Sequence, residues 1–124
     1  MKLKTLVPIL AVILTSSLFA GSVSWSSLAN YTHTTAGGTD YFYTTASTQF
    51  VAEINGYGHI GGTARAFEGS GQVYAWVEGI WDAPSVAQSN SGSLAPAGRT
   101  VIIYRTIGVY DYPSVGVSKV TATW

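Results

Sequence analysis

The chain has 124 residues, 47% of them hydrophobic and 10% charged, and its six Lys or Arg balance its six Asp or Glu. The chain lacks the excess of positive charge that binds a phosphate backbone, so the composition argues against nucleic-acid binding. The absence of cysteine excludes a disulfide scaffold, thiol chemistry and a cysteine-ligated zinc site. The length indicates one domain at most.

The beginning of the chain has the layout of a secretory signal peptide. Two lysines stand among the first four residues, residues 5–19 are uncharged, and small residues follow at 20–22. The apolar run is shorter than the roughly 20 residues that span a bilayer, and Pro8 interrupts it. We therefore expect cleavage within 20–22. This gives a signal peptide (1–20) and one secreted, extracellular β domain (21–124) with no stable membrane span.

The remainder of the chain has the composition of β-strands. Thr, Tyr, Val, Ile, Phe and Trp are abundant, and glycine, proline and asparagine mark turns between them. The expected strands are residues 22–28, 40–45, 48–54, 57–67, 72–81, 99–110 and 115–123. This spacing predicts an all-β fold, an antiparallel β-sandwich or flattened barrel of about six to seven short strands.

Two connections can be predicted from local composition. Asn55 and Gly56 both tolerate positive φ, which favours a tight hairpin at this point. Asp82-Ala83-Pro84 is a turn signal, and residues 83–98 are rich in Ser, Ala, Gly, Asn and Pro. We expect residues 83–98 to form one long loop.

The strand at 72–81 has two different faces, because side chains alternate across a strand. The apolar set is expected to face the core; it comprises Val73, Ala75, Val77, Gly79 and Trp81. The other set mixes aromatic rings with carboxylates; it comprises Tyr74, Trp76, Glu78, Ile80 and Asp82. Flat aromatic rings beside hydrogen-bond acceptors suit the apolar faces and hydroxyls of sugars, and also suit a protein contact.

Five side chains are therefore the candidate binding residues: Tyr74, Trp76, Glu78, Asp82 and Arg105. Arg105 lies on the strand at 99–110, whose two largely apolar faces indicate a central position in its sheet. The alternative interpretation is ordinary cross-strand packing, with Glu78 and Arg105 forming a surface ion pair.

Catalysis has little support in the sequence. Glu78 and Asp82 share a face but lie four residues apart, about 13 Å along a strand, which fits neither spacing of glycosidase carboxylates. No nucleophile-elbow motif occurs, and no Asp-dense loop supplies the oxygens that calcium requires. We expect no catalytic residue, no metal site and no cofactor.

Several segments resemble the lactococcin-972-like bacteriocins. They are Trp25 after the signal peptide, residues 50–52 (Phe-Val-Ala), residues 79–83 (Gly-x-Trp-x-Ala) and residues 104–106 (Tyr-Arg-Thr). The chain departs from the family at residues 41–43, where Tyr, Phe and Tyr stand in place of a His-bearing strand. The resemblance implies a secreted, two-sheet antibacterial protein that disturbs cell-wall synthesis.

These observations together predict a secreted, non-enzymatic protein that binds at the cell exterior. Its partner is a glycan, the cell wall or a protein surface, and the contact is made by exposed aromatic residues. The first alternative is a bacteriocin-like antibacterial protein. The second is a self-assembling extracellular structural subunit, because low charge and high β-propensity make pairing between strand edges easy.

Overall fold

The computed structural model describes residues 21–31, 33–68, 73–92, 95–110 and 113–124. The expected signal peptide lies outside these residues, as does the side chain of Tyr74. The described residues form six strands: β1 (Ser22–Asn30), β2 (Thr34–Tyr43), β3 (Gln49–Glu68), β4 (Val73–Ser91), β5 (Thr100–Val109) and β6 (Val115–Thr123). All of their pairings are antiparallel, which confirms the predicted fold class. Among the described residues, no helix is long and apolar enough to cross a membrane.

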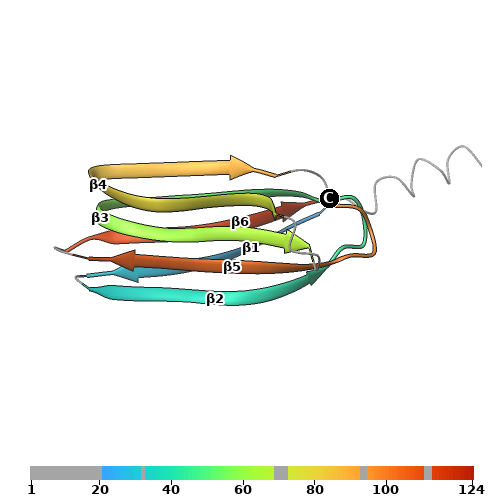
Figure 1. Cartoon of the computed structure of the whole chain (residues 1–124), viewed down its shortest axis with the longest axis horizontal. Coiled ribbons are helices and arrows are strands. Elements are labelled where there is room, and N and C mark those ends of the chain that lie inside the picture. Colours follow the sequence, from blue (N-terminus) through green and yellow to red (C-terminus); the bar gives the residue numbers. More distant parts are fainter. Residues whose placement is uncertain (1–20, 32, 69–72, 93–94, 111–112) are drawn as a thin grey trace, which may run out of the picture.

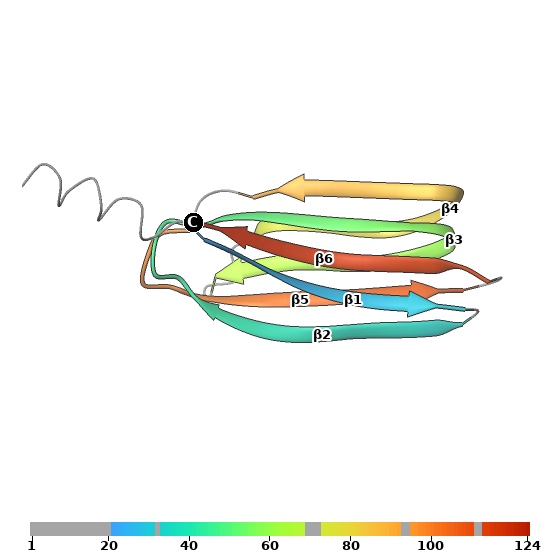
Figure 2. The ribbon, with the colours of Figure 1, turned by 180° about the vertical axis from the view of Figure 1, so that it is seen from behind.

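The strands form two sheets that face each other and share β3 and β4. Sheet I runs in the order β1, β6, the first half of β3 (residues 49–57) and the second half of β4 (residues 86–91). Sheet II runs β2, β5, the second half of β3 (residues 60–68) and the first half of β4 (residues 73–83). Figures 1 and 2 show β3 and β4 folding back together at one end of the molecule.

Glycines allow the β3–β4 ribbon to bend from one sheet into the other. The register shifts between Gly56 and Gly58. Gly58 has a φ of 84°, a backbone angle that residues other than glycine rarely adopt. A Cβ on Gly56 would lie 2.3 Å from the carbonyl oxygen of Val115 on β6. The predicted hairpin at Asn55-Gly56 is therefore wrong, since both residues lie within β3 and pair with β4 and β6.

The predicted loop at 83–98 is also wrong over most of its length. β4 continues through Asp82 and the following proline to Ser91, and residues 86–91 pair with β3. This segment lies at the edge of sheet I and leaves most of its side chains exposed. An edge strand with exposed side chains needs few large apolar residues. The small polar residues of this segment therefore resemble those of a loop.

The core lies between the two sheets. Its largest fully buried apolar side chains are Phe50, Ile54, Ile60, Val101, Ile103, Ile107, Val109 and Val120. The predicted alternation in β4 is confirmed over residues 75–78, because Ala75 and Val77 are buried whereas Trp76 and Glu78 are exposed. It is wrong for Gly79, which was expected to face the core and is exposed. The other side of sheet II therefore faces solvent and holds the candidate site.

Candidate functional site

The solvent-facing side of sheet II, here called its outer face, is formed by neighbouring strands in register. Trp76 of β4 lies opposite Arg65 of β3, and Arg65 lies opposite Tyr104 of β5. One step along, Glu78, Thr63 and Thr106 form the next row. Directly opposed residues of antiparallel strands share a face, so aromatic and charged side chains gather over these three strands.

A hollow of about 230 Å³ opens at one part of this face, lined by Arg65, Phe67, Trp76 and Glu78. Two of these lining residues, Arg65 and Glu78, form an ion pair in which the guanidinium donates to Glu78 Oε2. The indole of Trp76 is 50% exposed beside them. Phe67 packs edge-on against Tyr104, with ring centroids 5.5 Å apart. The hollow thus combines a free aromatic surface with polar groups already in place.

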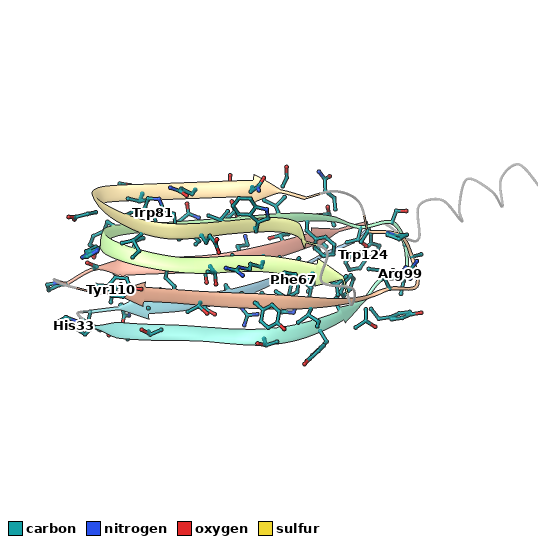
Figure 3. The ribbon with its side chains drawn as sticks, in the orientation of Figure 1. His33, Phe67, Trp81, Arg99, Tyr110 and Trp124 are labelled. Carbon is teal, nitrogen blue, oxygen red and sulfur yellow. The ribbon has the colours of Figure 1, made fainter. Side chains whose placement is uncertain are left out.

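A second hollow, of about 560 Å³, adjoins the first because Glu78 lines both. Its other lining residues are Gly62, Thr63, Gly79, Ile80, Thr106 and Tyr110. The Tyr110 side chain lies over two glycines. A Cβ on Gly61 would lie 3.1 Å from Tyr110 Cε2, and a Cβ on Gly108 would lie 2.9 Å from Tyr110 Oη. Phe67 lines the first hollow and Tyr110 the second, and the two side chains lie toward opposite ends of sheet II (Figure 3). We call these two joined hollows the aromatic groove.

The structure brings together two of the five predicted binding residues. Trp76 and Glu78 both line the aromatic groove. Asp82 is exposed farther along β4 and lines neither hollow. For Tyr74, only the backbone position on β4 is described. It lies two residues before Trp76, so it has the same parity, meaning the same place in the alternation of side chains along the strand.

The ion pair between Glu78 and Arg105, which belonged to the alternative interpretation of this face, does not form. Arg105 lies on the inner side of sheet II, 9% exposed, and its guanidinium donates to Asp40 of β2. Gly38 leaves the space that this guanidinium occupies, since a Cβ there would lie 2.4 Å from Arg105 Nη2. Arg105 therefore holds β5 to β2 inside the sandwich and takes no part in the aromatic groove.

Among the groove residues that were not predicted as binding residues are Arg65, Phe67 and Tyr110. A signal for the first two is present in the sequence. Ala64 and Ala66 alternate with Arg65 and Phe67, and small apolar residues at every second position indicate which side of a strand is buried. Tyr110 has the same parity as Tyr104 and Thr106, so strand alternation groups it with them, and its ring reaches the groove over Gly108 just beyond the end of β5.

The arrangement is suited to binding. The Arg65 guanidinium donates hydrogen bonds and the Glu78 carboxylate accepts them, and each partly neutralises the other. The pair is well exposed, with side chains 37% and 51% accessible, so it contributes at most about 1 kcal/mol to stability. Within the described part of the chain, no group of three or more metal-ligating side chains is found.

Comparison with known proteins gives remote likenesses in fold alone. No family model and no curated protein matches the chain. The enzymatically active domain of tailspike protein 4 of bacteriophage CBA120 aligns over 86% of this chain and 18% of its own, at 7% identity and a TM-score of 0.44. The VP2 subviral particle of infectious bursal disease virus aligns over 82% of this chain and 32% of its own, at 10% identity and a TM-score of 0.43.

A third solved structure is the C-terminal family 6 carbohydrate-binding module of the laminarinase LamC from Zobellia galactanivorans. It aligns over 84% of this chain and all of its own length, at 10% identity and a TM-score of 0.37. The chain spans only 18% and 32% of the tailspike and VP2 chains. At these TM-scores, the neighbours carry no argument about what the chain binds.

Proposed function

We propose that this chain is an exported, non-enzymatic binding module that takes a carbohydrate of a cell surface or cell wall into the aromatic groove. The observation that carries the proposal is the half-exposed indole of Trp76 beside the Arg65–Glu78 ion pair. A ligand that covers an exposed apolar ring binds favourably, because apolar surface is thereby removed from water. The ion pair supplies directional polar contacts within the same hollow.

The chemistry of a sugar matches this combination of groups. A sugar ring presents C–H groups on its faces and hydroxyls around its rim. The face of an indole carries the negative part of its quadrupole, so it attracts polarised C–H groups. Arg65 can donate to a hydroxyl oxygen while Glu78 accepts from a hydroxyl hydrogen. Because these two charges offset each other, the groove favours a neutral ligand over an anionic one.

The shape of the groove favours a chain of sugars over a single ring. Its two hollows lie side by side and share Glu78 in their lining. Trp76 and Ile80, which line different hollows, are four residues apart on β4, a separation of about 13 Å along a strand. A ligand that fills both hollows therefore contacts Trp76 at one point and Tyr110 at another, and each contact adds to affinity.

The test is a retention assay with purified protein and three kinds of bait: intact bacterial cells, peptidoglycan and insoluble neutral polysaccharides. We expect retention on at least one glycan, and loss of retention in Trp76→Ala, because the substitution removes the stacking surface. The matched control is Tyr57→Ala, which removes an aromatic ring of similar exposure, 48%, that lines neither hollow of the groove.

The outcomes separate the possible functions. Equal retention of Trp76→Ala and the unchanged chain, or no retention on any bait, contradicts the proposal. Retention on a wall fraction together with growth inhibition of related bacteria would instead favour the bacteriocin-like alternative. Circular dichroism of both variants checks that each keeps the β-sandwich.

A further inference from the structure

The second half of β4 forms a sheet edge that is open on one side. Residues 86–91 pair with β3, and within the described chain no strand pairs with their other side. A row of unpaired backbone N–H and C=O groups is a template for another strand. The side chains along this row are mostly exposed, so they do not cover it.

The hydrogen-bond ladder shows which backbone groups face outward. The N–H of Gly92 donates to the carbonyl of Phe50 at 2.8 Å, which makes these two a hydrogen-bonded pair. Bonded and non-bonded pairs alternate along antiparallel strands. Following the register, Ala87, Ser89 and Ser91 therefore direct both their N–H and C=O groups away from β3. Their side chains are small, so none of them obstructs an approaching strand.

This edge lacks the devices that normally prevent strands of two molecules from pairing. Residues 86–91 contain no charged residue and no proline. The other flank of the sandwich differs, because β1 and β2 contact each other there. β2 also carries an inward-pointing charge, Asp40, bound to Arg105. The first half of β4 carries Glu78, which would bring like charges near each other in a symmetric pair.

We propose that two copies of this chain pair antiparallel through residues 86–91, about a two-fold axis at Ser89. In that register Ser89 faces Ser89, Gln88 faces Asn90 and Ala87 faces Ser91 of the second copy. The outward backbone groups then exchange hydrogen bonds in pairs. The amides of Gln88 and Asn90 both donate and accept, so they complement each other across the axis. Because each copy uses the same edge, the assembly closes as a dimer.

Ser89→Lys provides a specific test of this pairing. Ser89 lies opposite Glu53 of β3, so the introduced lysine has a carboxylate neighbour within its own sheet and the monomer is expected to fold. In the dimer, two introduced lysines would meet at the axis, where directly opposed like charges are destabilising. Thr35→Lys is the matched control, because it adds the same charge at an exposed position on β2, at the other flank.

Ser89→Pro tests the backbone contribution separately. The N–H of Ser89 points away from β3, so proline removes an outward donor and leaves the β3–β4 ladder intact. Its effect does not depend on charge or on salt concentration. A similar effect of both variants therefore assigns the contact to the edge itself.

Sedimentation equilibrium over a concentration series measures the outcome. We expect a monomer–dimer equilibrium for the unchanged chain, with the dimer Kd raised at least about tenfold in Ser89→Lys and Ser89→Pro and unchanged in Thr35→Lys. A chain that stays monomeric at every concentration overturns the proposal. So does a dimer that both Ser89 variants leave intact, or open assemblies larger than a dimer. Ser89 lines a further hollow together with Trp76 and Glu78 of the groove, so glycan retention of both Ser89 variants is measured beside their sedimentation to separate dimerisation from glycan binding.

Discussion

Two glycines determine how Tyr110 lies at the end of the aromatic groove. Gly61 of β3 and Gly108 of β5 are neighbours in register, and the ring of Tyr110 covers both. The ring also contacts His59, with centroids 5.3 Å apart, and the Tyr110 N–H donates to the His59 carbonyl. The backbone of Tyr110 is thus fixed, whereas its ring position depends on the absence of a side chain beneath it.

Gly108→Ala is therefore expected to weaken ligand binding without unfolding the protein. The added Cβ would lie 2.9 Å from Tyr110 Oη and 3.0 Å from Cζ, so the ring must move. The far end of a tyrosine can swing toward solvent, and we expect the free energy of unfolding to change by no more than about 1 kcal/mol. Affinity for a retained glycan is expected to fall about tenfold, or about 1.4 kcal/mol.

Isothermal titration with a soluble fragment of that glycan measures the affinity, and urea unfolding measures the stability. Thr100→Ala, at an exposed position on β5 that lines neither hollow, is the control. An unchanged affinity in Gly108→Ala would exclude Tyr110 from the binding surface while leaving the role of Trp76 open.

Strand parity made part of this site predictable. Alternation in β4 correctly separated Trp76 and Glu78 from the buried Ala75 and Val77. It failed for Arg105, because parity groups residues on a face without telling which face is buried. Arginine is almost never buried unless it is paired, and here Asp40, sixty-five residues away in the sequence, supplies the partner. Local sequence patterns hold no information about such a distant contact.

At the scale of elements, the main difference between expectation and structure is the length of β3 and β4. The sequence predicts a turn at Asn55-Gly56 and a loop from residue 83, whereas the strands have 20 and 19 residues and bend at these points. The same residues that permit a tight turn also permit a bend with close backbone approach. Which of the two occurs depends on β6, whose backbone passes next to Gly56.

Gly56→Ala is expected to destabilise the fold by about 2–3 kcal/mol, because overpacking forces the backbone to shift. The new Cβ would meet the Val115 carbonyl oxygen at 2.3 Å and the Gly116 Cα at 2.8 Å. Gly98→Ala is the comparison: its φ is 78°, but the nearest atom to its Cβ would be Tyr43 Oη at 3.7 Å.

The comparison separates crowding from backbone strain. Gly98→Ala introduces only a strained φ, at a cost of about 1 kcal/mol. Urea unfolding of both variants gives the two free energies. If Gly56→Ala is no more destabilising than Gly98→Ala, the close passage of β6 does not maintain the bend.

At the scale of the whole molecule, the shared strands bind the two sheets into one unit. Each of β3 and β4 contributes one half to sheet I and the other half to sheet II. Most of the buried apolar side chains lie in a single cluster between the sheets. Loss of either sheet would therefore expose the core of the other.

We accordingly expect one cooperative unfolding transition. Tryptophan fluorescence and far-ultraviolet circular dichroism should give coincident curves in urea, as two-state behaviour requires. Trp25 reports on β1 in sheet I, and Trp76 and Trp81 report on the half of β4 in sheet II. Two separated transitions would show that the sheets unfold independently and that the bends do not couple them.

The pairing of β1 with β6 has a consequence for the time course of folding. β1 is the first described strand and β6 is the last, and they are neighbours in sheet I. During synthesis β1 has no partner in its sheet until residues 115–123 have been made. Such distant pairing slows folding, so the growing chain stays unfolded for longer. If the chain is exported as proposed, that delay would keep it threadable until it has crossed the membrane.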